Sequence, residues 1–360
     1  MSSMKTIIKN FNKFIEEGEE LNNINEGGLK APHLTGDVRL DPATVTNAVK
    51  VYETVMSLWN EYLQSNGHQP ITLIGPVGST AYYKRDEPSA EYGDVDFLIS
   101  LPVEVDDTMG HNDARKAENK TQREYEKLLK DFLTTTSGID KLVHVEATVG
   151  SSPYLLIVRL PNGDHVQVDT IVTHPKYSDK KSQWMPGRWT PEHGIKGYTI
   201  GNLYMALGGY FNMAIGDRGV TARMMDGERV SSRKTSADLV TISTNIRTFL
   251  RDMAEEIAGG NVIENELLTK YPGVDPENVK IGDLALGIKG LALTLSDNGI
   301  IESSSDMLAG ILDRYLSGLT RNVESKKKRG ASDEAYAKLI KLNDRVYNIA
   351  KQAFGNGQDA

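Results

Sequence analysis

The sequence contains no cysteine. Disulfides, zinc sites with thiolate ligands and cysteine nucleophiles are therefore excluded. It also lacks any apolar run close to the roughly 18 residues that are needed to cross a bilayer, and residues 1–19 have no apolar core of the kind found in signal peptides. The chain has seven histidines, yet none are arranged as His-x-x-x-His, the spacing of a helical metal site. We expect a cytoplasmic protein that does not contact membranes.

A surplus of positive charge is missing as well, because the formal net charge is −8. Proteins that bind long polyanions often carry a basic surplus, so this balance slightly favours small partners. The charge is uneven, however, since residues 174–234 contain ten lysines and arginines against five acidic residues. This stretch is a candidate contact for a phosphate-rich ligand. Ordinary scatter of charge over solvated faces is the alternative interpretation.

The 360 residues, of which 39% are hydrophobic, are enough for about two domains with a sizeable core. Strand patterns are confined to the region before residue 174, and helical periodicity dominates after it. We therefore predict an N-terminal extension at 1–40, a domain that contains a sheet at 41–175, and a mainly helical domain at 176–360. Strands followed by helices predict the α+β class, with an α+β domain joined to a helical one.

Local signals place the elements. Asp41-Pro42 is typical of a helix start, and Asn162-Gly163 between alternating runs is typical of a hairpin turn. In the first domain the patterns predict helices at 42–65 and 113–133 and strands at 71–74, 94–100, 144–149, 154–160 and 165–172. In the second domain they predict helices at 200–215, 236–258, 281–296, 305–319 and 333–354, with an exposed linker at 324–330.

Three aspartates carry the candidate chemistry. Asp94 and Asp96 stand one residue apart at the start of a predicted strand, so both side chains point to one face, roughly 6–7 Å apart. Asp169 alternates with the valines of His165-Val-Gln-Val-Asp169 and points away from the face that those valines occupy. A charged group in a central strand is costly to bury unless it is paired or bound to a metal. If the two strands are neighbours, the three carboxylates converge, and such a set can hold two divalent cations.

A fourth feature is Gly78-Ser79, which follows a predicted strand. Glycine allows the backbone to approach a phosphate closely, and Ser79 with the nearby amides can donate to phosphate oxygens. The pair is also a common turn, so it gains meaning only from what surrounds it.

The order strand, Gly78-Ser79, Asp94-Val-Asp96 on the next strand and Asp169 on a later strand resembles the polymerase β-like nucleotidyltransferase superfamily. That superfamily includes tRNA CCA-adding enzymes, poly(A) polymerases, antibiotic nucleotidyltransferases and cyclic-oligonucleotide synthases. The resemblance covers roughly residues 40–175. It implies a nucleotidyltransferase-type mixed sheet with flanking helices, followed by a mainly helical domain. It also implies that Asp94 and Asp96 hold two Mg²⁺ or Mn²⁺ ions and that Asp169 completes the site where the acceptor hydroxyl loses its proton. Gly78 and Ser79 would bind the triphosphate.

The sequence departs from the superfamily pattern after Gly78-Ser79. Asp94 follows Ser79 by fifteen positions, a longer spacing than the family uses, and the residues after Ser79 lack its usual glycine- or arginine-containing stretch. Lys84 or Arg85 could supply positive charge to the triphosphate, or could be ordinary loop residues. Arg188 and His193 stand in a segment that looks like a triphosphate-binding segment of archaeal-type CCA-adding enzymes, interrupted here by Trp189. A simple helix start is the alternative there.

The predicted function is therefore transfer of a nucleotidyl group from a nucleoside triphosphate, with ATP the expected donor, to an acceptor hydroxyl. An RNA 3′ end is the first choice of acceptor. A nucleotide, giving a cyclic or linear oligonucleotide signal, is the second, and a small molecule is the third. A catalytically inactive nucleotide-binding module is the alternative from outside the enzyme class.

Overall fold

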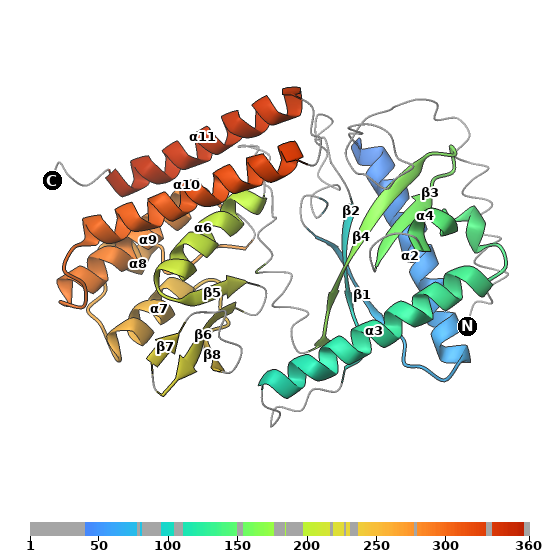
Figure 1. Cartoon of the computed structure of the whole chain (residues 1–360), viewed down its shortest axis with the longest axis horizontal. Coiled ribbons are helices and arrows are strands. Elements are labelled where there is room, and N and C mark those ends of the chain that lie inside the picture. The colour runs from blue at the N-terminus through green and yellow to red at the C-terminus, as the bar shows by residue number, and fades with distance from the viewer. Residues whose placement is uncertain are drawn as a thin grey trace. The chain divides into compact units, whose positions relative to one another are not determined.

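The computed structural model of the chain describes residues 40–77, 80, 95–103, 111–149, 154–175, 184, 197–216, 219–226, 228–230, 237–276, 279–328 and 333–355. The chain divides into two compact units, Met1–Ser178 and Asp179–Ala360. Figure 1 shows their helices and strands. Apart from Leu40, the predicted N-terminal extension lies outside the described residues.

The first unit begins with helix α2 (Pro42–Ser65), as predicted. The Asp41 side chain caps it by accepting from the Thr44 backbone amide at 2.6 Å, and Pro42 occupies the first turn, where its missing N–H costs nothing. Apolar residues recur every three or four positions along α2 and are buried. They form the layer on which the sheet packs; the buried stripe includes Val45, Val49, Tyr52, Met56, Trp59 and Leu63.

The sheet of this unit has four strands in the order β1-β2-β4-β3. They are β1 (Thr72–Val77), β2 (Val95–Ser100), β3 (Leu155–Arg159) and β4 (His165–Thr173). The pair β2 and β4 is parallel, and the other two pairs are antiparallel, so the sheet is mixed. β3 and β4 form the predicted hairpin, with Gly163 at φ 88° in the turn, a conformation that glycine adopts without strain.

Helix α2 covers one face of this sheet. The Tyr52 ring lies 4.6 Å from the Phe97 ring, measured between centroids, and its hydroxyl is 2.9 Å from the Thr170 hydroxyl. Phe97 and Thr170 are register partners on β2 and β4. Because side chains alternate along a strand, the residues next to them in sequence point to the opposite face.

Helix α3 (His111–Thr135) confirms the helix predicted at 113–133 and packs on α2, with Trp59 and Tyr125 rings 6.3 Å apart. The strand predicted at 144–149 is wrong, because Val145–Val149 forms the short helix α4, preceded by the 3-10 turn η2 (Ile139–Lys141). Only Val143 makes a β-bridge, to Val158. The Thr148 hydroxyl accepts from the Ile157 amide, which ties α4 to β3.

The second unit is mainly helical, but its described part also contains a four-stranded sheet that the sequence analysis did not predict. Its strands are β5 (Met213–Gly216), β6 (Gly219–Met225), β7 (Glu228–Val230) and β8 (Asp238–Ser243). Its helices are α6 (Gly197–Tyr210), α7 (Phe249–Ala258), α8 (Glu266–Lys270), α9 (Ile281–Asp297), α10 (Ser304–Lys328) and α11 (Asp333–Gly355).

Three boundaries in this unit therefore differ from prediction. The helix expected at 200–215 ends at Tyr210, and the one expected at 236–258 is the strand β8 followed by α7. The predicted linker at 324–330 is helical as far as Lys328. The α+β class itself is confirmed. None of the described helices has the length and apolar character that a membrane span requires.

Candidate active site

Two of the three predicted aspartates lie side by side on the sheet of the first unit. In β2 the neighbours Val95 and Phe97 are buried, whereas Asp96 is half-buried. In β4 the Thr170 hydroxyl meets Tyr52 of α2, so the preceding residue, the half-buried Asp169, points to the other face. Both aspartates therefore point away from the face that α2 covers.

Asp96 and Asp169 are register partners in the parallel β2–β4 ladder. Neighbouring strands lie about 4.8 Å apart, so the two carboxylates stand next to each other on one face. Like charges directly opposite each other destabilise a sheet. Two carboxylates on one face of neighbouring strands are a candidate site for a divalent cation.

Burial and one hydrogen bond act on the Asp169 carboxylate. Burial raises the pKa of the Asp169 carboxyl, and a hydrogen bond from Gln167 acts in the opposite direction. The Gln167 amide donates to the Asp169 Oδ1 at 2.6 Å, and Gln167 itself is buried. The carboxylate has therefore lost part of its water and is held in position by one neutral donor, as expected for a side chain that is oriented for a ligand.

One buried hydroxyl connects the site to the segment that follows Gly78-Ser79. The Thr80 Oγ1 accepts from the Asp96 backbone amide at 3.1 Å, and Thr80 is fully buried. Thr80, the residue directly after Ser79, is thus hydrogen-bonded to the backbone of Asp96, a candidate metal ligand. Neither Thr80 nor Gln167 is among the site residues predicted from the sequence. For Gln167 the available signal was its position two residues before Asp169, on the same face of the strand.

The remaining predicted site residues lie outside the described residues: Asp94, Gly78, Ser79, Lys84, Arg188 and His193. Their roles stay predictions. Within the described part of the chain, no group of three or more His, Asp or Glu side chains is arranged to hold a metal ion. Asp96 and Asp169 form a pair, and the third predicted ligand, Asp94, directly precedes β2 in sequence.

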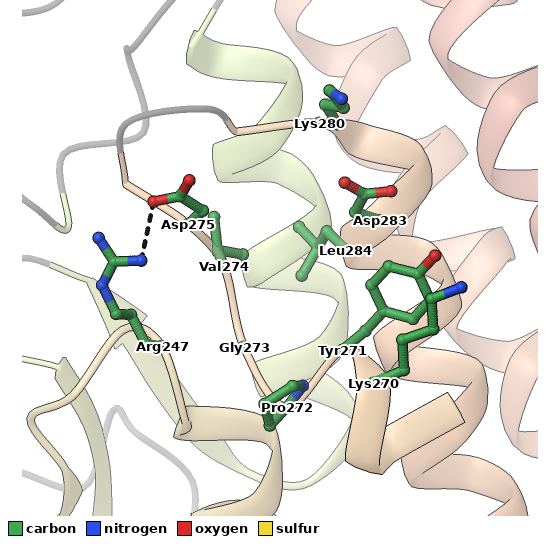
Figure 2. A pocket seen from close by; sticks show the side chains of 10 residues that line it. All are labelled: Arg247, Lys270, Tyr271, Pro272, Gly273, Val274, Asp275, Lys280, Asp283 and Leu284. Carbon is green, nitrogen blue, oxygen red and sulfur yellow. Dashed lines mark ion pairs between the residues drawn. The ribbon is translucent and has the colours of Figure 1, made fainter. Parts of the chain in front are cut away.

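A pocket in the second unit has a different character. Its ten lining residues come from the segment before α7, from α8 with the residues that follow it, and from the start of α9 (Figure 2). Three cations line it together with Asp275 and Asp283, and the Arg247 guanidinium forms an ion pair with Asp275 at 2.9 Å. It contains none of the predicted site residues, and its opposite charges partly compensate each other, so we assign it no role.

No family model matches the chain, and no curated protein matches it. Among solved structures, polymerase beta of Leishmania infantum in a ternary complex matches with a TM-score of 0.32 and 11% sequence identity, over 75% of this chain and 87% of that one. A likeness this distant carries no argument about activity.

Proposed function

We propose that the protein is a metal-dependent nucleotidyltransferase that moves a nucleoside monophosphate from a nucleoside triphosphate, with ATP as the expected donor, to the hydroxyl of an acceptor such as an RNA 3′ end. The observation that carries the proposal is the pairing of Asp96 with Asp169 across two parallel strands, on the face opposite α2. This is the arrangement that the sequence pattern required if its aspartates were to act together.

The donor set fits a hard divalent cation. Mg²⁺ and Mn²⁺ prefer oxygen ligands, and Mg²⁺ is usually held by one or two carboxylates together with substrate phosphates. The positive charge would offset the burial of Asp169, which raises the pKa of its carboxyl. Asp96 and Asp169 would hold the ion together with Asp94. A bound ion would neutralise charge that develops on the transferred phosphoryl group.

The protein's own part in the reaction would be placement. The acceptor oxygen forms a bond to the α-phosphorus, the bond from that phosphorus to the bridging oxygen breaks, and pyrophosphate leaves. The acceptor proton would pass to the Asp169 carboxylate. Gly78, Ser79, Lys84, Arg188 and His193 are the residues from which triphosphate contacts are expected. Correct alignment of two reactants can supply a large share of the rate acceleration.

Incubation of the protein with each labelled nucleoside triphosphate and Mg²⁺, with and without RNA, tests the proposal. We expect label to enter a product only when the divalent cation is present, with ATP the best donor and RNA extended at its 3′ end. Resolution of the products by size separates extended RNA from a small oligonucleotide and from a modified small molecule. Absence of any labelled product with every nucleotide and acceptor would refute the proposal.

A second test needs no acceptor. Replacement Asp96→Asn removes the charge of a candidate metal ligand on the strand next to Asp169 and keeps the size of the side chain. Mg²⁺ with ATP should stabilise the parent by about 2.7 kcal/mol at a hundredfold excess over Kd, which is several degrees at about 2–4 °C per kcal/mol for a unit of this size. The variant should lose most of this increase. Equal metal-dependent shifts in both proteins, measured by differential scanning fluorimetry, would contradict the assignment.

A further inference from the structure

A cluster of basic side chains lies at the turn end of the β3–β4 hairpin. Arg159, the last residue of β3, and His165, the first residue of β4, are register partners. The ring of His144 lies 5.1 Å from the ring of His165, measured between centroids, at an interplanar angle of 47°. All three side chains are half-buried, so each keeps some contact with solvent.

This cluster shares a face of the sheet with Asp169. His165, Gln167 and Asp169 alternate with Val166 and Val168 along β4, so their side chains share one face of the strand. On that face the Gln167 amide donates to the Asp169 carboxylate. Asp169 follows His165 by four positions, which is about 13 Å along the strand. Figure 1 shows β3 and β4 side by side over this length.

The three side chains of the cluster are all basic, so they do not neutralise one another. Burial is the largest cause that lowers the pKa of the His165 imidazole, and the nearby Arg159 and His144 lower it further. Asp164 acts in the other direction and raises this pKa. The Asp164 carboxylate already accepts from the Asn162 amide in the hairpin turn at 2.8 Å. Among the described residues, Nε of Arg159 and Nε2 of His165 have no hydrogen-bond partner. A bound phosphate would accept a charged hydrogen bond from the Arg159 guanidinium and would favour the protonated form of His165.

We propose that Arg159, His165 and His144 bind a phosphate group of the acceptor, about 13 Å along β4 from the aspartate pair. The inference rests on the proposed function and narrows it. An acceptor whose reacting hydroxyl lies at Asp169 reaches the cluster only if its phosphate-bearing chain is a few nucleotides long. The acceptor class is therefore an oligonucleotide or RNA end, and a small unphosphorylated molecule is excluded.

The test is binding of a short fluorescein-labelled oligoadenylate to the full chain in EDTA, followed by fluorescence anisotropy. Arg159→Gln should weaken binding roughly tenfold, the loss typical of one charged hydrogen-bonding contact. Loss of one phosphate contact should also lower the slope of log K against log salt by about 0.7. His165→Gln should give a smaller loss, and Arg159→Lys should restore part of the affinity because it keeps the charge. Arg123→Gln, which makes the same change at an exposed position on α3, is the matched control and should bind like the parent.

The outcomes separate this inference from the function on which it rests. Unchanged oligoadenylate affinity and salt slope in folded Arg159→Gln and His165→Gln proteins would overturn the subsite, whether or not the parent transfers nucleotides. If Arg159→Gln weakens binding of ATP or inorganic phosphate but not of oligoadenylate, the cluster holds the donor or a free anion, and the acceptor assignment is wrong. If the variants lose oligoadenylate affinity in EDTA as expected but the parent protein makes no labelled product, the phosphate-binding assignment stands. The proposed nucleotidyl transfer is then wrong.

Discussion

Asp169→Asn is expected to reduce labelled nucleotidyl transfer by about a thousandfold or more, because one metal-binding carboxylate contributes several kcal/mol to the stabilisation of transition-state charge. The fold should survive the change. Asparagine keeps the oxygen to which Gln167 donates, and a neutral amide costs less to bury than the carboxylate it replaces. The measurement is the rate of label incorporation from ATP with saturating Mg²⁺, together with a thermal melt of the same preparation.

The matched control is Asp140→Asn, which removes one exposed carboxylate from the turn η2 in the same unit. It should transfer nucleotides at the parental rate. Asp169→Asn protein that melts normally and keeps even a tenth of the parental rate would show that Asp169 is not a metal ligand. An inactive variant whose melt is normal and which still binds oligoadenylate in EDTA would locate the loss in the chemical step.

The sequence could predict which faces the aspartates occupy, but not which strands are neighbours. Alternation along β2 and β4 follows from the positions of valine and phenylalanine around Asp96 and Asp169. Register between strands depends on packing across the whole sheet, here on the way Tyr52 of α2 meets Phe97 and Thr170. The functional hypothesis therefore assumed that the strands of Asp96 and Asp169 are neighbours. The strand pairing itself comes from the structure.

The incorrect strand at 144–149 has a local cause. Val145 and Val149 are β-branched, so propensity alone favours a strand. The backbone amide of His144 and the hydroxyl of Thr148 instead satisfy the carbonyl and the amide of Ile157, which leaves the residues between them free to form one short helical segment. A side-chain hydrogen bond of this kind competes with a β-ladder, and composition does not reveal it.

The sheet of the second unit was missed because its strands are short and its pattern is ambiguous. β5 has four residues and β7 has three, too few for periodicity to be recognised. In β8 the apolar residues Leu239 and Ile242 continue the three-to-four-residue spacing of Ile246, Leu250 and Met253, so the whole stretch resembles one amphipathic helix. Pairing of β8 with β6 decides the matter, and that contact is not local.

Helices α8 and α9 of the second unit pack with their backbones in close contact. Two glycines of α9, Gly287 and Gly290, face the α8 segment. A Cβ added at Gly290 would lie 2.3 Å from the Leu268 amide nitrogen and 2.7 Å from the Leu267 carbonyl carbon, both backbone atoms. A Cβ at Gly287 would lie 2.5 Å from the Tyr271 carbonyl oxygen. The backbone of α8 can approach α9 this closely only because these two side chains are absent.

Gly290→Ala should therefore destabilise the second unit by about 3 kcal/mol, near the upper end for overpacking, because backbone rather than a flexible side chain must move. Gly282→Ala is the control on the same helix, since its added Cβ would meet nothing closer than an Ile349 methyl carbon at 3.7 Å. That change should be neutral or stabilise by up to about 1 kcal/mol through helix propensity. Urea unfolding followed by circular dichroism measures both. If the two alanines had equal effects, α8 could not lie against Gly290, and the packing of α8 on α9 described here would be wrong.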